Sequence, residues 1–364
     1  MHICELDTPA VVVDLDILDK NLNEMASYCA QHGLSLRPHT KTHKIPEIAR
    51  MQIRAGARGI TVAKLGEAEV MAREGLDDIL AAYPIVGPGK LERLVALAQR
   101  GRITVSTDSA EVALGISDAA RQAGVTIRLL AEMDAGLRRC GVQTPDDLVA
   151  LSQHMTRLPR IEFLGFMFFP GQVRLPPEEQ APVLAQIDAR LHEAQEKLFR
   201  SGIQVRAVSG GSTPTAYQSH LMKTVTEIRP GTYVFNDMNT VSIGATRLSR
   251  CAVTVHVTVV SVAVKGRAVI DGGSKTFSSD LLRGGEGRGF GLCVEHPGII
   301  LESMSEEHGH LNVEACPGQV RVGDRLRFIP NHVCTTVNMH DEVCGARGEE
   351  VVERWPVAGR GRVR

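Results

Sequence analysis

The chemistry-bearing side chains of this chain are densest in RPHTKTHK, residues 37–44, which contains His39, Lys41 and Lys44. The stretch follows the apolar–polar alternation LSLRP, which predicts a short strand with HTK at its carboxyl end. A lysine that is partly desolvated and lies beside other cations has a lowered pKa, and its neutral amine can form a Schiff base with an aldehyde cofactor. A solvated basic loop would have the same composition, so the stretch alone leaves both readings open.

A second pattern is formed by His332 and Cys334 in PNHVCTTVNMHDE, residues 330–342. If this segment is a strand, positions i and i+2 point to one face. Imidazole and thiolate together suit a divalent ion such as zinc, and two protein ligands leave positions open for water or substrate. The alternative is a buried cysteine close to an unrelated histidine.

The run VSGGSTPT, residues 208–215, is a glycine-rich turn that follows a strand-like segment. Gly210 and Gly211 let the backbone approach an anion, and Ser212 and Thr213 add hydroxyl donors. The pattern fits a phosphate site and equally fits a plain turn.

Three other turns contain candidate groups. RPGTY ends in Tyr233, and MDAGLRRCGV contains Arg138 and Arg139, which could lie beside a cofactor ring or form surface ion pairs. The glycine-rich run at 284–291 lacks the strand-to-helix context of a dinucleotide fingerprint, so it predicts a loop.

The elements that must position these groups alternate between strand and helix. Apolar runs and helical patterns recur every 25–30 residues or so, about eight times, which predicts a closed (β/α)₈ barrel over residues 20–245. From about residue 246 the chain is β-branched and poor in helix patterns, which predicts an antiparallel β domain over 246–364. TPAVVVDLD near the start reads as a strand that joins this domain, so residues 1–19 are assigned to it. The fold class is therefore α/β with an additional all-β domain.

Bulk properties narrow the function classes. The chain has 364 residues, 43% hydrophobic and 23% charged, as in ordinary soluble proteins. A formal net charge of −1 argues against nucleic acid or an anionic membrane as partner. No run approaches the roughly 20 apolar residues of a membrane span, and no signal peptide is evident. Eight scattered cysteines without a C-x-x-C pair are expected to be reduced, which fits a cytoplasmic protein.

Seven separated motifs occur in one order along nearly the whole chain: LDTPAVVVDLD, RPHTKTHK, MDAGLRRCGV, SGGSTPT, EIRPGTYVFND, SEEHG and PNHVCTTVNMHD. In order and spacing they resemble the D-threonine aldolase and eukaryotic-type D-serine dehydratase family, among the alanine-racemase-like (fold type III) pyridoxal phosphate (PLP) enzymes. The resemblance implies a PLP-bearing barrel, a second β domain, a homodimer with shared active sites and a D-amino acid substrate.

The resemblance also implies roles for the PLP-binding residues. Lys41 matches the family's Schiff-base lysine, with His39 in the same motif, and Lys44 is then a supporting or surface residue. Arg139 matches an arginine that faces the pyridine nitrogen and keeps it unprotonated. The implied phosphate-binding residues are Gly210, Gly211, Ser212, Thr213 and Tyr233.

His332 and Cys334 match the family's pair of divalent-metal ligands, with zinc or manganese as the ion. In the family, this metal ion binds the β-hydroxyl of the substrate. His308 in SEEHG is expected near the site. One departure stands out: aldolases carry a histidine after the strand GLQAYHG, where this chain reads GFMFFPG with Pro170. Gln172 is the nearest polar substitute, and the apolar FFPG indicates a substrate with a bulkier or more apolar β-substituent.

The reaction implied is a PLP- and metal-dependent lyase acting on D-3-hydroxy amino acids, with retro-aldol cleavage to glycine and an aldehyde placed first. The alternative is dehydratase-type elimination to a 2-oxo acid and ammonia, with Lys41 as the base for Cα. A racemase needs a second base opposite Lys41, and none is identified. A non-catalytic PLP-binding protein has no need of a metal pair.

Overall fold

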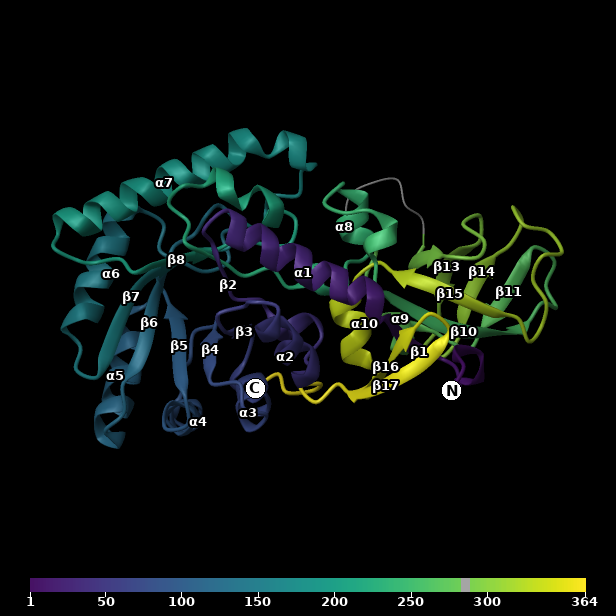
Figure 1. Ribbon diagram of the computed structural model, residues 1–364, viewed down its shortest axis with the longest axis horizontal. Helices are drawn as coiled ribbons and strands as arrows, with labels where there is room; N and C mark the ends of the chain where they lie inside the picture. The colour runs from purple at the N-terminus through teal and green to yellow at the C-terminus, as the bar shows by residue number, and fades with distance from the viewer. Residues whose placement is uncertain (283–288) are drawn as a thin grey trace. The chain divides into compact units, whose positions relative to one another are not determined.

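The computed structural model describes residues 1–282 and 289–364 (Figure 1). Most of the loop predicted at 284–291 lies outside these residues. The chain forms two compact units that interleave in sequence. Unit 1 comprises Met1–Glu24, Thr42–Ile45 and Thr232–Arg360, and unit 2 comprises Met25–Lys41, Pro46–Gly231 and Gly361–Arg364. The predicted domain limits, 20–245 and 1–19 with 246–364, stay a prediction. No helix in the described part of the chain is long and apolar enough to cross a membrane.

Unit 2 is built on a parallel sheet in the order β2-β9-β8-β7-β6-β5-β4-β3. Its strands are β2 (Ser35–Leu36), β3 (Ile60–Val62), β4 (Asp78–Ala81), β5 (Arg102–Thr107), β6 (Ile127–Glu132), β7 (Ile161–Met167), β8 (Ala207–Gly210) and β9 (Glu227–Ile228). A parallel bridge between His39 and Thr61 joins the two ends of this sheet, next to a hydrogen bond from the Thr61 N–H to the Pro38 carbonyl. The predicted eight-stranded parallel barrel is confirmed.

Helices connect the barrel strands, as the alternating pattern predicts. They are α2 (Pro46–Arg54), α3 (Leu65–Arg73), α4 (Pro88–Ala98), α5 (Ala110–Ala123), α6 (Pro145–Arg157) and α7 (Ala181–Arg200), and α1 (Leu15–Gln31) contains residues of both units. Helices α4, α5 and α6 pack outside β5–β7 (Figure 1). Local signals set their ends: Thr144 and Asp147 form a capping box at the start of α6, and Gly124 in the left-handed region ends α5. After β8 the chain forms a 3₁₀ helix rather than an α-helix.

The barrel interior contains a buried network of charges. Arg37 forms ion pairs with Asp78 at 2.7 Å and with Glu227 at 2.8 Å. Glu227 also accepts a hydrogen bond from the Ser209 hydroxyl at 2.6 Å, and this hydroxyl accepts one from Arg229 at 2.8 Å. Burial lowers the pKa of Arg229 to about 10. Because each buried charge has a partner of opposite sign or a hydrogen-bonding group, the network tolerates its low-dielectric surroundings.

Unit 1 contains a second, nine-stranded sheet in the order β11-β14-β13-β12-β15-β10-β1-β16-β17. Its strands are β1 (Ala10–Asp14), β10 (Val253–Ser261), β11 (Arg267–Ile270), β12 (Gly291–Cys293), β13 (Ile300–Met304), β14 (Gly309–Asn312), β15 (Arg325–Pro330), β16 (Glu342–Arg347) and β17 (Glu350–Pro356). An additional β10–β11 pairing closes six of them, β10 to β15, into an antiparallel barrel. Strand β1 pairs with β10, which confirms that TPAVVVDLD joins this sheet. It pairs with β16 in parallel, so the sheet is not wholly antiparallel as predicted.

Short helices complete unit 1: α8 (Met238–Ser242), α9 (Ser274–Phe277) and α10 (Val333–Met339). The described residues also form the 3₁₀ helices η1 (Ile3–Glu5), η2 (Thr40–Thr42), η3 (Pro177–Glu179), η4 (Ala216–Leu221), η5 (Thr232–Val234) and η6 (Leu248–Arg250).

Candidate active site

Lys41 lies in η2, just beyond the carboxyl end of β2, and is half-buried. Its N–H donates to Nδ1 of His39 at 3.3 Å, and the His39 N–H donates to the Pro230 carbonyl at 3.0 Å. Its Nζ lies 5.7 Å from the centroid of the Phe169 ring, which follows β7 by two residues. Both side chains come from carboxyl ends of barrel strands, the face where barrel enzymes place their chemistry.

Arg139 reaches the same aromatic ring from the loop after β6. Its guanidinium carbon lies 4.8 Å from the Phe169 centroid, although the arginine is largely exposed. A cation over an aromatic face at this range contributes about 0.5–2 kcal/mol, depending on how far it is desolvated. Arg138 instead has a left-handed backbone with φ of 57°, and its N–H donates to Asp134 at 2.9 Å. The structure thus brings Lys41 and Arg139 to one ring, and Arg138 shapes the turn.

Glu132, the last residue of β6, is a buried carboxylate that the sequence analysis did not single out. Burial raises its pKa, although Arg229 and Arg139 act in the opposite direction. Its Oε2 accepts a hydrogen bond from Ser106 at 3.4 Å. The available signal was a charged residue at the end of the apolar run VTIRLLAE, which is where an α/β barrel carries polar groups.

The glycine-rich turn follows β8, the seventh strand of the barrel counted from β2. A Cβ on Gly210 would lie 2.0 Å from Cε1 of Phe168, and Gly211 has φ of 88°, so side chains are disfavoured at both positions. Ser212 is buried; its N–H donates to the Thr215 hydroxyl at 3.2 Å, and Thr213 is half-buried. Loops after the seventh and eighth strands of such barrels commonly bind phosphate, so this side-chain-free cradle fits the PLP phosphate.

Tyr233, the other residue expected near the phosphate, lies in η5 of unit 1 and is 2% exposed. The phosphate turn belongs to unit 2.

His332 and Cys334 lie at the start of α10, where His332 is the N-cap residue. The segment is therefore not the strand that the spacing argument considered, because β15 ends at Pro330 and the backbone turns into a helix. The two side chains nevertheless interact, because each shifts the pKa of the other. Cys334 also lies 3.3 Å from the hydroxyl of Thr42, the residue that follows Lys41 in the chain.

The pair is electrostatically polarised. Burial lowers the pKa of His332, but hydrogen bonds to Asp237 and Cys334 outweigh it and raise this pKa to about 10. Burial raises the pKa of Cys334, and His332 more than offsets that, so the thiol pKa is lowered overall. A thiolate beside an imidazole that a carboxylate orients is a donor set that fits zinc or a similar ion. The described residues contain no group of three or more histidine, cysteine or carboxylate side chains that could hold a metal, so the pair would leave positions open.

The remaining predicted residues have different surroundings. Pro170 is buried beyond β7, and Gln172 is exposed, with its amide donating to the Ala135 carbonyl in the loop that carries Arg139. Gln172 therefore tethers this loop. His308 is exposed on the turn between β13 and β14 of unit 1.

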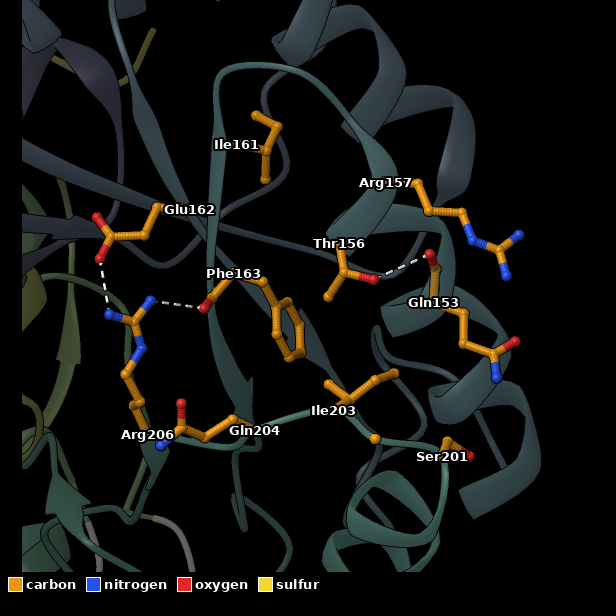
Figure 2. A pocket seen from close by; sticks show the side chains of 11 residues that line it. Gln153, Thr156, Arg157, Ile161, Glu162, Phe163, Ser201, Ile203, Gln204 and Arg206 are labelled. Atoms are coloured by element: carbon orange, nitrogen blue, oxygen red, sulfur yellow. Dashed lines mark hydrogen bonds and ion pairs between the residues drawn. The ribbon is translucent and has the colours of Figure 1, made fainter.

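A surface pocket of about 550 Å³ lies at the opposite, amino end of β7 (Figure 2). Several of its polar groups pair within the pocket: Arg206 binds Glu162 and the Phe163 carbonyl, and the Thr156 hydroxyl donates to the Gln153 carbonyl. Because the amino-terminal face of such barrels serves stability, we do not place the active site there.

Comparison with known proteins identifies the family. Residues 13–238 match the model of the alanine racemase N-terminal domain, and residues 252–346 match that of a putative serine dehydratase domain. The chain is 34% identical over 367 residues to D-threonine aldolase from Arthrobacter sp., covering 99% of this chain and 94% of the relative.

Solved structures agree with this match. The D-threonine aldolase from Filomicrobium marinum is 31% identical, with a TM-score of 0.91 and coverage of 99% of this chain and 97% of that one. D-threo-3-hydroxyaspartate dehydratase from Delftia sp. HT23, solved as a cysteine-to-alanine mutant in the metal-free form, is 31% identical with a TM-score of 0.91 and covers 98% of both chains. The chain belongs to the alanine racemase N-terminal domain family.

Proposed function

We propose that this member of the family is a PLP- and divalent-metal-dependent lyase that cleaves D-3-hydroxy amino acids to glycine and an aldehyde. The observation that carries the proposal is the match along almost the whole chain to a D-threonine aldolase, including both domains. The position of Lys41 at the carboxyl face of the barrel, on the same ring as Arg139, supports it. We also propose that the protein is a cytoplasmic homodimer.

The residues that would hold PLP follow from the barrel. Lys41 would attach it covalently, supported by His39 and with Arg139 beside its ring. The phosphate would bind at the turn formed by Gly210, Gly211, Ser212 and Thr213, with Tyr233 as a further phosphate-side group. When bound, the cofactor supplies an electron sink for the electrons released when a bond to the substrate's Cα breaks.

The protein's own residues would prepare the substrate. The Phe169 ring presents its face to both cationic side chains, Lys41 and Arg139. The pair His332 and Cys334 would hold a divalent ion, which supplies Lewis-acid polarisation of the substrate's β-hydroxyl. Since Pro170 replaces the histidine of related aldolases, no side chain at that position can take the hydroxyl proton. Activation of the β-hydroxyl would then depend more on the metal ion, and the apolar surroundings of Pro170 favour a substrate with a bulky or apolar β-substituent.

Dehydration to a 2-oxo acid and ammonia is the second candidate, because the likeness to the Delftia dehydratase spans 98% of the chain. In that reaction the Lys41 amine removes the proton from Cα. The two reactions need the same cofactor and metal residues and differ in which bond breaks.

Product analysis after incubation of the PLP- and metal-loaded protein with D-threonine separates these candidates. Glycine with acetaldehyde supports the aldolase, and 2-oxobutanoate with ammonia supports the dehydratase. If the protein holds PLP and yields neither, a panel of D-3-hydroxy amino acids with larger β-substituents follows, and inactivity with the whole panel would overturn the proposal. L-Threonine and a Lys41→Ala variant are the controls.

A further inference from the structure

The buried carboxylate of Asp237 lies behind the proposed metal ligand His332. The two residues are 95 positions apart, and Oδ2 of Asp237 lies 3.3 Å from Nδ1 of His332. The Asp237 side chain is 1% exposed, whereas that of His332 is 27% exposed. The imidazole therefore has its Nδ1 beside a buried acceptor, while the ring as a whole is partly exposed.

The two oxygens of Asp237 have different partners. Oδ1 accepts from the N–H of Thr240 at 2.9 Å and caps α8, as a good N-cap residue does. Oδ2 accepts from the N–H of Val333 at 3.1 Å, in the first turn of α10, and contacts His332. One oxygen thus holds α8, and the other holds both the start of α10 and the histidine that precedes it.

The different partners of the two oxygens separate a structural role, the capping of helices, from a second role, the orientation of His332. If Asp237 only capped helices, its Oδ1 bond and the Val333 contact would be sufficient. In the neutral imidazole that a metal ion requires, the added contact favours hydrogen on Nδ1, the nitrogen that faces the carboxylate. An N–H at Nδ1 that donates to a carboxylate leaves the lone pair of Nε2 available, and such carboxylate–histidine pairs orient metal-binding imidazoles.

We propose that Asp237 is the positioning residue of the metal site: its Oδ2 holds His332 in the tautomer and orientation that present Nε2 to a divalent ion. The inference rests on the proposed metal-assisted function. The metal affinity of the protein then depends on a residue that is not itself a ligand. Outer groups of this kind typically contribute about 10- to 100-fold to affinity.

The test compares Asp237→Asn and Asp237→Ser with Thr240→Val in the full-length, PLP-loaded protein. Asparagine and serine both remain good N-caps for α8, but neither presents a carboxylate to His332. Thr240→Val removes the hydroxyl that bonds Asp237 on the α8 side and leaves the His332 contact in place. Zn²⁺ affinity is measured by competition with a chromophoric chelator, together with the melting temperature and PLP content.

We expect Zn²⁺ affinity to fall about 10- to 100-fold in both Asp237 variants, with PLP content unchanged. Thr240→Val should melt at a lower temperature with wild-type Zn²⁺ affinity. With Co²⁺ as probe, the thiolate-to-metal absorbance from Cys334 should persist in the Asp237 variants while the ligand-field bands shift. Wild-type affinity and spectra in both Asp237 variants would overturn the inference. A wild-type protein whose Zn²⁺ binding is unaffected by His332→Ala and Cys334→Ala would overturn the proposed metal site itself.

Discussion

Replacing Gly210 with alanine tests the packing beneath the proposed phosphate turn. The new Cβ would lie 2.0 Å from Cε1 and 2.3 Å from Cζ of Phe168. Carbon atoms pack favourably at about 3.5–4.0 Å, so the ring must move by about 1.5 Å. Phe168 is fully buried, and its carbonyl accepts a hydrogen bond from Arg229 at 2.9 Å, so it has little freedom to move. Such overpacking costs about 1–3 kcal/mol.

This cost corresponds to a melting temperature lower by roughly 2–12 °C for a domain of this size. The displaced turn should also bind PLP more weakly, because its backbone no longer fits the phosphate. Thermal unfolding followed by circular dichroism and equilibrium dialysis of PLP measure the two effects. Gly89→Ala is the matched control: it lies in α4, a Cβ added there would have no atom within 4 Å, and alanine favours a helix. Unchanged melting and PLP affinity in Gly210→Ala would refute the packing argument.

Further predictions concern the lysines, the metal and pH. Lys41→Ala should fold normally and lose its PLP on dialysis; an active, yellow variant would contradict the assignment. Lys44→Met should keep PLP but lose about 1–3 kcal/mol in urea unfolding, because the buried Lys44 ammonium donates to Asn338 at 2.8 Å. Chelation should abolish turnover but leave the PLP colour, with Zn²⁺ or Mn²⁺ restoring activity; turnover by verified metal-free protein would count against the metal role. Burial lowers the pKa of His256 from 6.5 to about 4, so the unfolded chain takes up this proton first. The contribution of neutral His256 to the free energy of unfolding is present in full above pH 6.5 and is lost as the pH falls toward 4. At 1.36 kcal/mol per pKa unit, the total loss is about 3 kcal/mol. The variant His256→Gln should therefore show a flatter decrease in the free energy of urea unfolding over this acid range.

The barrel was predictable because each of its units repeats one local signal. Apolar runs buried on both faces, followed by amphipathic helices with caps such as Thr144 and Gly124, leave few arrangements other than a parallel sheet covered by helices. Details that depend on neighbours far along the chain were not predictable. The parallel pairing of β1 with β16 joins residues more than 300 positions apart, and it leaves no periodic trace in the sequence.

The residues of the candidate site also fall into those with a local sequence signal and those without one. Lys41 and the glycine turn could be located because a polar motif directly after a barrel strand lies at the catalytic face whatever its neighbours are. Glu132 has the same strand-end position, but a single carboxylate has no spacing pattern to mark it. Phe169 was visible as part of an apolar departure from the family pattern. Lys41 and Arg139 lie near the same aromatic ring because the ends of three strands meet there. This meeting is determined by the closed barrel and not by any local pattern.

The proposed metal pair shows how a prediction of proximity can hold although the segment is not a strand. His332 has extended backbone angles, φ of −136° and ψ of 97°, and the helix begins only at the next residue. An extended N-cap followed by the first helical turn lets side chains two positions apart meet, as they would on a strand. The H-x-C spacing therefore predicted proximity for a reason that holds in both backbones. Asp237 had no such local signature, since its link to His332 spans 95 residues, and its role depends on which of its two oxygens faces which helix. Spacing identifies ligands that are close in sequence, whereas the groups that orient them become visible only once distant segments are packed together.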